Sequence, residues 1–191
     1  PNLLGNIADW KKIFKIAKKY KLKIIEDSAD TIGYSLNGKN LGKYSDITTN
    51  SLYASHVITG AGFGGVVCFN DRQNYERAKL LRGWGRSSAI FNESEGLKLR
   101  FNKKVDGIPY DGKYIFSELG YNFLPSEISA AFALEQLKKL KNNVKTRIKN
   151  FEKLYRFFKN YSQLFDLPTQ INGIKTGWLA YPIIIKPSSK I

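Results

Sequence analysis

The chain has 191 residues, of which 42% are hydrophobic, so it can form one domain with a hydrophobic core, or one domain and part of another. Its net charge of +15 comes mainly from lysines spread over expected helix faces, which favours a solvated surface over nucleic-acid binding. The single cysteine, Cys68, excludes an internal disulfide, fits a reducing cytoplasm and is expected to pack as a small hydrophobic residue.

The ends and the hydropathy of the chain add two further expectations. The sequence begins at Pro1 and contains no methionine, so we expect a fragment of a longer protein. It has no run of 18 consecutive apolar residues, and we therefore expect no membrane-spanning segment.

The first part of the chain alternates helix and strand signals. Asp9 precedes a helical pattern over residues 10–20, and a short apolar strand follows over residues 22–25. Residues 47–53 are expected to form another strand, and residues 66–69 a buried one. A helix followed by a strand is one unit of a parallel α/β sheet, whose strand ends collect ligands.

Two glycine-containing segments lie between these elements. Asn37-Gly38-Lys39-Asn40, flanked by residues 34–36 and Leu41, is typical of a hairpin turn. The glycine-rich residues 60–65 lack the Lys-Ser or Lys-Thr of a P-loop, so we expect a backbone that passes close to another group.

The second part of the chain is expected to be mostly helical. A helix is predicted over residues 73–81, and a long loop over 83–114 that is functional or a subunit contact. Pro125 opens a strong helical pattern that continues to Tyr161, with a plausible break at Asn142-Asn143. Residues 179–185 are expected to form a final strand.

Four polar residues lie near the ends of the strands predicted over residues 22–25 and 47–53. Asp27 could contact a cofactor, but alone it is more often a helix N-cap or a turn residue. Asp30 could contact a neighbouring group of the cofactor, and its alternative is also a turn. Ser51 could donate a hydrogen bond to a phosphate, and alone it is uninformative. His56, the only histidine, is by itself more often a core or surface residue than a catalyst.

Motifs along the chain give these residues a context. They are, in order, Asn2-Leu3-Leu4-Gly5-Asn6, Ile25-Glu26-Asp27-Ser28-Ala29-Asp30, Gly42-Lys43-Tyr44-Ser45-Asp46-Ile47, Ser51-Leu52-Tyr53 and Gly120-Tyr121-Asn122-Phe123-Leu124-Pro125-Ser126-Glu127. From Asn2 to about Pro182 the chain resembles the DegT/DnrJ/EryC1/StrS family, the sugar aminotransferases of nucleotide-sugar metabolism. The resemblance implies a partial large domain of the aspartate-aminotransferase type (fold type I, α/β) over residues 1–141. A linker helix and the truncated start of the small C-terminal domain would follow over residues 142–191.

The resemblance also implies a role for each candidate residue in binding pyridoxal 5'-phosphate or pyridoxamine 5'-phosphate. Asp27 matches the residue that pairs with the pyridine nitrogen, and Asp30 matches the position near the ring hydroxyl. Ser51 matches a phosphate-binding hydroxyl, and Asn122 matches an Asn that reaches the phosphate in the neighbouring subunit of a homodimer. His56 matches the lysine that forms a Schiff base with the cofactor in most members.

Histidine in place of that lysine is the mark of the nucleotide-sugar 3-dehydratases within the family. The resemblance therefore implies loss of the 3-hydroxyl from a nucleotide-activated 4-keto-6-deoxy sugar, for surface polysaccharide (O-antigen) biosynthesis in the cytoplasm. An iron–sulfur cluster, which some members carry, is not expected, because the Trp84-Gly85-Arg86-Ser87-Ser88 stretch contains no cysteine and a cluster needs about four thiolates. No other metal site is expected.

Two other functions stay open from the sequence. The first is transamination of the 4-keto sugar without a Schiff-base lysine, using an amino donor such as glutamate. The second is a basic binding protein without enzymatic activity, which only the positive charge supports.

Overall fold

The computed structural model describes residues 1–40, 42–91 and 96–187. The chain forms two compact units, one made of residues 1–70 and 126–191 and the other of residues 71–125. Each unit is described by itself below. The predicted division of the chain at residue 141 into a large-domain part and a small-domain part remains a prediction.

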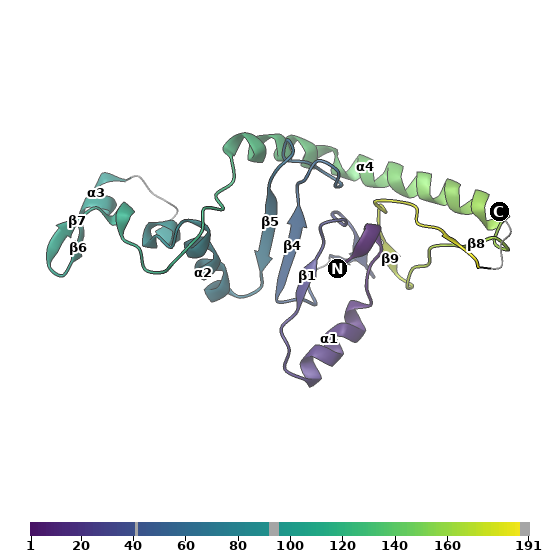
Figure 1. Ribbon diagram of the computed structural model, residues 1–191, viewed down its shortest axis with the longest axis horizontal. Coiled ribbons are helices and arrows are strands. Elements are labelled where there is room, and N and C mark those ends of the chain that lie inside the picture. The colour runs from purple at the N-terminus through teal and green to yellow at the C-terminus, as the bar shows by residue number, and fades with distance from the viewer. Residues whose placement is uncertain (41, 92–95, 188–191) are drawn as a thin grey trace. The chain divides into compact units, whose positions relative to one another are not determined.

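The first unit contains a three-stranded sheet with the strand order β1-β4-β5 (Figure 1). Strand β1 (Ile25–Asp27) runs parallel to β4 (Ile47–Ser51), and β4 pairs antiparallel with β5 (Gly65–Phe69). Asp27 lies opposite Thr49 in the register of β1 and β4. Because the two strands are parallel, the segments that follow them leave the sheet at the same edge.

Strand β5 differs from the expectation of a buried strand. Val66 and Val67 are 47% and 51% exposed, and Cys68 is exposed as well. The prediction that Cys68 packs as a small hydrophobic residue is therefore wrong. β5 is the outer strand of the sheet, and its side chains alternate between two faces that are open in the described part of the chain.

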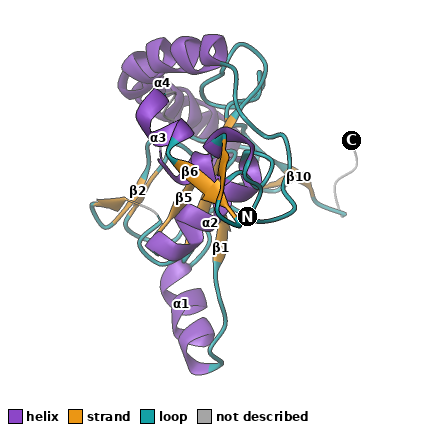
Figure 2. Cartoon of the chain, turned by 90° about the vertical axis from the view of Figure 1, so that its left-hand side faces the viewer, coloured by secondary structure: helices purple, strands orange, loops and turns teal. Residues whose placement is uncertain are grey.

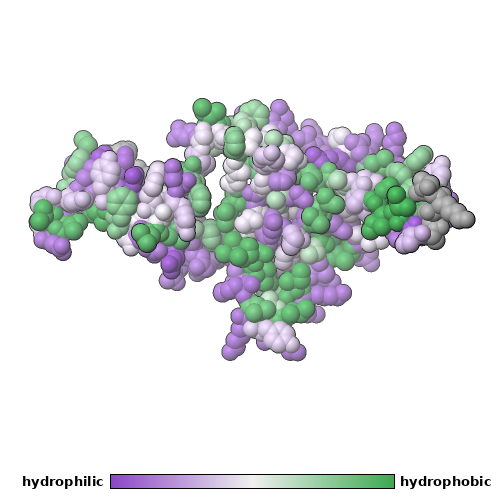
Figure 3. Space-filling view, in the orientation of Figure 1, coloured by the Kyte–Doolittle hydropathy of each residue, from purple (hydrophilic) through white to green (hydrophobic). Residues whose placement is uncertain are grey.

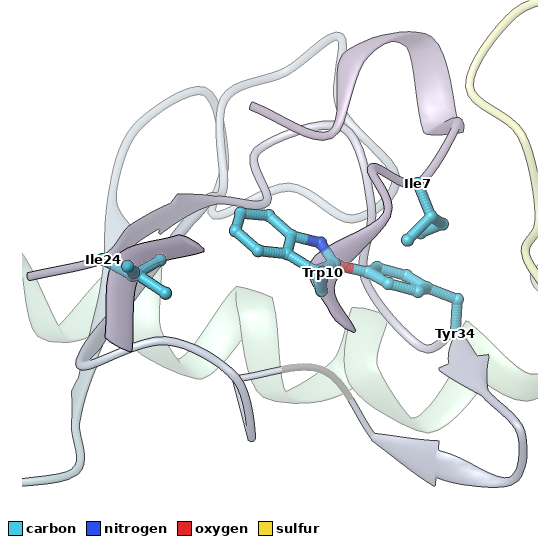
Figure 4. Close-up of a cluster of buried hydrophobic side chains, with 5 residues drawn as sticks. Ile7, Trp10, Ile24 and Tyr34 are labelled. Carbon is cyan, nitrogen blue, oxygen red and sulfur yellow. The ribbon is translucent and has the colours of Figure 1, made fainter. Parts of the chain in front are cut away.

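The hydrophobic core of the first unit forms around helix α1 (Trp10–Lys19), as the periodicity predicts. The side chain of Asp9 caps the helix by accepting a hydrogen bond from the backbone N–H of Lys12 at 3.2 Å. The buried cluster gathers residues before, within and after this helix (Figure 4): Ile7, Trp10, Ala17, Ile24 and Tyr34. The helix therefore docks the start of the chain against the sheet.

The outer face of α1 is solvent-exposed and carries its lysines. These charges are intermixed with exposed apolar side chains, among them Ile16 at 55% and Leu22, just beyond the helix, at 59% (Figure 3). None of the helices in the described ranges combines the length and the apolar character needed to cross a membrane.

The predicted hairpin is present. Strands β2 (Ser35–Leu36) and β3 (Lys39–Asn40) pair antiparallel, and the turn residues Asn37 and Gly38 have φ angles of 50° and 74°. Two successive positive φ angles are what a tight two-residue hairpin turn requires. The flanking Leu41 lies outside the described residues, and the other neighbour of β2 is β9 (Ile174–Lys175).

Helix α4 (Glu127–Lys159) runs uninterrupted through Asn142 and Asn143, so the expected break is absent. The middle of α4 packs closely against two glycines, Gly33 and Gly177. A Cβ on Gly33 would lie 3.0 Å from the Leu140 side chain, and one on Gly177 would lie 3.3 Å from the backbone of Val144. After α4, β8 (Phe165–Asp166) pairs with β10 (Ile184–Ile185), which is shorter than the strand expected over 179–185.

The second unit contains more regular structure than the expected loop over 83–114. The elements are α2 (Arg72–Arg82), the 3₁₀ helix η2 (Ser87–Phe91), α3 (Leu97–Phe101), β6 (Lys103–Val105), β7 (Ile108–Tyr110) and the 3₁₀ helix η3 (Gly112–Tyr114). Figure 2 labels α2 and α3, drawn as helices, and β6, drawn as a strand. Helix α2 confirms the predicted helix over 73–81. Where a loop was expected, β6 and β7 form a hairpin that turns at Asp106 and Gly107, with φ angles of 49° and 79°. An Asp-Gly pair is a strong hairpin signal, and it is the local reason that this segment is ordered.

We expect Gly85→Ala to destabilise the protein far more than Gly107→Ala. Both glycines have similar positive φ angles, 76° and 79°. A Cβ at Gly85 would collide with the carbonyl oxygen of Glu118, whereas a Cβ at Gly107 would meet nothing within 4 Å. Gly107→Ala should cost about 1 kcal/mol for its backbone conformation, and Gly85→Ala roughly 3 kcal/mol or more. Denaturant unfolding of the two variants measures the difference, and equal losses would contradict the close approach at Gly85.

Candidate functional site

The shared edge of β1 and β4 places three of the sequence-predicted residues in one region. Asp27 ends β1, Ser51 ends β4, and Asp30 lies three residues beyond β1. The Asp27 side chain is exposed, and one of its carboxylate oxygens accepts a hydrogen bond from the backbone N–H of Ala29 at 3.0 Å. Its other oxygen is therefore free of this turn contact and available to a ligand.

His56 lies beside Asp30. The imidazole Nε2 is 3.6 Å from Oδ1 of Asp30, a distance at which a protonated histidine and a carboxylate form an ion pair. The other oxygen of Asp30 accepts a hydrogen bond from the backbone N–H of Leu4 at 2.8 Å, which fixes the carboxylate. Both side chains are largely buried, being 21% and 17% exposed. The sequence predicted each residue separately, but not this contact.

The second nitrogen of the His56 ring is Nδ1. Nδ1 is buried, and no described residue forms a hydrogen bond with it. A buried polar atom without a partner costs free energy unless another group satisfies it. With Nε2 directed at Asp30, Nδ1 is the nitrogen that remains for a ligand or for exchange of a proton.

The segment between Ser51 and His56 is a tight turn. The Ser51 hydroxyl oxygen accepts a hydrogen bond from the backbone N–H of Tyr53 at 3.1 Å, and the backbone N–H of His56 donates to the carbonyl of Tyr53 at 3.1 Å. Because Ser51 accepts in this contact, its own hydrogen remains able to point at a phosphate oxygen. Tyr53 also packs edge-on to the His56 ring, with centroids 6.0 Å apart, and sequence reasoning did not single it out as a site residue.

The glycine-rich segment after His56 folds back on the end of β4. The carbonyl of Leu52 accepts from Gly60 N–H at 2.8 Å, and the N–H of Leu52 donates to Gly64 at 3.0 Å. A Cβ on Gly60 would collide with the carbonyl oxygen of Phe63. The glycines thus permit a close approach of backbone to backbone, which supports the strand end that carries Ser51.

Asn122 belongs to the second unit, where it forms an isolated β-bridge with Gly83. Asp27, Asp30, Ser51 and His56 all belong to the first unit. Its assignment to a cofactor phosphate remains a prediction.

The residues at the strand ends fit the pyridoxal cofactor expected from the sequence. They offer an exposed carboxylate for a protonated ring nitrogen, a hydroxyl for a phosphate, and an imidazole with an unpartnered nitrogen. Among the described residues, no three His, Cys, Asp or Glu side chains are grouped so that they could hold a metal ion.

The sequence model of the DegT/DnrJ/EryC1/StrS aminotransferase family matches residues 2–190. The lipopolysaccharide biosynthesis protein RfbH of Salmonella typhimurium is 31% identical over 98% of this chain and 44% of its own length. The GDP-4-keto-6-deoxy-D-mannose 3-dehydratase of Yersinia pseudotuberculosis is 33% identical over the whole of this chain and 46% of its own length. The chain thus spans about half the length of the curated relatives it matches.

Solved structures agree with these relatives. The structure of E. coli GDP-4-keto-6-deoxy-D-mannose-3-dehydratase with bound hydrated PLP superposes with a TM-score of 0.81 and 29% sequence identity. The match covers 100% of this chain and 46% of that one. The predicted α/β fold of the pyridoxal-phosphate aminotransferase type, present in part, is therefore confirmed.

Proposed function

This chain belongs to the DegT/DnrJ/EryC1/StrS aminotransferase family, and from this membership we propose that it is part of a nucleotide-sugar 3-dehydratase that uses pyridoxal phosphate or pyridoxamine phosphate. The substrate is a nucleotide-activated 4-keto-6-deoxy sugar, and the product serves the biosynthesis of a surface polysaccharide. The names of the similar proteins support this substrate class and this pathway.

The observation that carries the proposal is His56 beside Asp30, near the ends of the two parallel strands. An imidazole can accept and return a proton near neutral pH. It cannot form the covalent bond to an aldehyde that a lysine amine forms. A protein with histidine here is therefore suited to moving protons on a cofactor that it does not tether.

Each residue of the site has a defined task in this reaction. When bound, pyridoxamine phosphate supplies an amine for the 4-keto carbon and a ring that accepts electrons. Asp27 would hold the ring nitrogen protonated, and Ser51 would donate a hydrogen bond to the phosphate. His56 would be the acid–base group, since Nδ1 could accept a proton in the loaded site and the imidazolium could return it to the leaving 3-hydroxyl of the sugar. Asp30 stabilises the imidazolium through Nε2.

Further properties of the complete enzyme are proposed on the same grounds. We propose a cytoplasmic homodimer in which Asn122 of one subunit reaches the cofactor phosphate in the other. Glutamate is the proposed amino donor that regenerates the amine form. We also propose that residues 1–141 belong to the large domain, and that residues 142–191 lead into the small one.

The alternative function is transamination of the same 4-keto sugar, which the family's aminotransferase members favour. One experiment separates the two. The complete protein is incubated with pyridoxal phosphate, glutamate and a 4-keto-6-deoxy nucleotide sugar, and the products are measured by mass spectrometry. Dehydration gives a sugar that has lost the 3-hydroxyl, whereas transamination gives an amino sugar that retains it. An amino sugar as the only product would contradict the dehydratase proposal, and an unchanged substrate with no cofactor bound would contradict both.

A further inference from the structure

The last two residues of β1 are adjacent carboxylates that lie in opposite environments. Glu26 is fully buried, with 0% of its surface exposed, whereas Asp27 is exposed at the proposed cofactor site. Successive side chains of a strand point to opposite sides, so whatever fixes one of them also fixes the other. The contacts of Glu26 therefore bear on the position of Asp27.

Within the described part of the chain, five groups donate hydrogen bonds to the buried carboxylate of Glu26, and all five are neutral. Oε1 accepts from the side chains of Asn2, Ser28 and Tyr34 at 3.1, 2.9 and 3.2 Å. Oε2 accepts from the backbone N–H of Gly42 at 3.0 Å and from the hydroxyl of Ser45 at 3.2 Å. A buried charge is tolerated only when such donors satisfy it. Burial also raises the pKa of Tyr34, so its hydroxyl stays protonated and able to donate.

Asn2 joins this network with a fixed orientation. Its side-chain oxygen accepts from two groups that can only donate, the backbone N–H of Ala8 at 3.2 Å and the indole N–H of Trp10 at 3.0 Å. The amide therefore cannot turn over, and its NH₂ group must face Glu26. Asn2, Gly42 and Ser45, which come from two of the sequence motifs, therefore all donate to the same carboxylate.

The backbone of residues 2–4 also donates hydrogen bonds to the two acids of the proposed cofactor site, Asp27 and Asp30. The backbone N–H of Asn2 donates to the carbonyl oxygen of Asp27 at 2.8 Å. Two residues later, the N–H of Leu4 donates to the carboxylate of Asp30, the partner of His56. A displacement of Asn2 would therefore reach both acids of the proposed site.

We propose that Asn2 and Glu26 are positioning residues that set the placement of Asp27 and Asp30 toward the cofactor, without touching it themselves. This inference rests on the proposed function. It assigns a role to two motif residues, Asn2 and Glu26, that the reaction itself does not use.

The test is a pair of single variants and their combination in the complete protein. Glu26→Gln replaces one carboxylate oxygen with an NH₂ group, which can only donate. In one orientation of the amide this group faces the NH₂ of Asn2, and in the other it faces the N–H of Gly42. In both cases two donors face each other, and a hydrogen bond is replaced by a repulsion. Asn2→Asp places two carboxylates in contact. In the double variant the carboxylate at position 2 accepts from the amide at position 26, whose oxygen again faces Gly42 and Ser45, and the network closes.

The readouts are the dissociation constant of the cofactor and the position of its visible absorbance band, which depends on the protonation of the ring. We expect each single variant to bind the cofactor about tenfold or more weakly and to shift the band, since a loss of this size corresponds to one buried hydrogen bond. The double variant should recover most of the affinity and the wild-type band. Ser45→Ala, which removes a single contact at Oε2, is a milder variant that should shift both readouts in the same direction.

The matched control is Val144→Ala, which removes a buried side chain from α4 outside the network. Even if Val144→Ala lowers the melting temperature as much as the single variants do, it should retain the wild-type absorbance band. Equal band shifts in the control, or unchanged binding in both single variants, would overturn the positioning role. If the wild-type protein binds no cofactor, the proposed function fails and this inference fails with it.

Discussion

Replacing His56 with lysine is expected to tether the cofactor to the protein and to suppress dehydration. The ε-amine would stand where the imidazole lies, near Asp30 and the ends of β1 and β4, and an amine there can bond to the aldehyde of pyridoxal phosphate. After reduction with borohydride, the intact mass of the variant should increase by one cofactor. Formation of the dehydrated sugar should fall roughly 10²–10⁴-fold, the usual contribution of a positioned acid–base group.

Two controls define this result. The wild-type protein carries many lysines, so an absence of labelling after the same reduction shows that trapping needs the amine at position 56. His56→Gln has no amine and should lose dehydration without gaining a tether. If His56→Lys folds and binds the cofactor but is never labelled, then His56 does not lie at the cofactor and the proposed mechanism is wrong.

The elements that the sequence predicted well are those with local signals. Asp9 caps α1 as expected, and the Asn37-Gly38 pair forms the turn between β2 and β3. In both cases the residues that decide the structure lie within four positions of one another. Such signals depend little on the rest of the chain.

Tertiary contacts decided two of the features that were predicted wrongly, the break in α4 and the burial of β5. Each asparagine in a helix costs only a few tenths of a kcal/mol. In α4, the packing of Leu140 against Gly33 and of Val144 against Gly177 overrides that cost. The exposure of β5 depends on which strands and helices cover it, which its own apolar sequence cannot reveal. The hairpin at Asp106-Gly107, in contrast, was readable from the sequence and was missed.

The candidate site was predictable as a set of residues but not as an arrangement. Asp27 and Ser51 follow from the ends of two predicted parallel strands, and His56 from its place after the second. The contact between Asp30 and His56 spans 26 positions, and nothing local in the sequence specifies it. Nor does the sequence tell which of the adjacent acids Glu26 and Asp27 faces the interior, because a strand only requires that they face opposite ways.

Replacing Asp27 with asparagine is the second change expected to have a large effect. An exposed carboxylate at the end of β1 stabilises positive charge on a ring nitrogen, whereas a neutral amide does not. A bound ring without that charge would accept electrons poorly, and the proton transfer proposed for His56 would be slower. We expect turnover to fall roughly 10²–10³-fold, the usual cost of removing one group that stabilises charge in a transition state. Steady-state rates at saturating cofactor measure this loss, and Asp166→Asn, which alters an exposed acid on β8, should leave them unchanged.

A cofactor analogue in which carbon replaces the ring nitrogen isolates the contact of Asp27. If the carboxylate acts only through that nitrogen, the analogue should slow the wild-type protein about as much as Asp27→Asn does, and it should slow the variant little further. This is the non-additivity expected when two changes remove the same interaction. Fully multiplicative losses would instead mean that Asp27 acts elsewhere, for example by holding the turn through Ala29. The Asp27 carboxylate would then be a structural group, and the proton balance of the ring would have to depend on another residue.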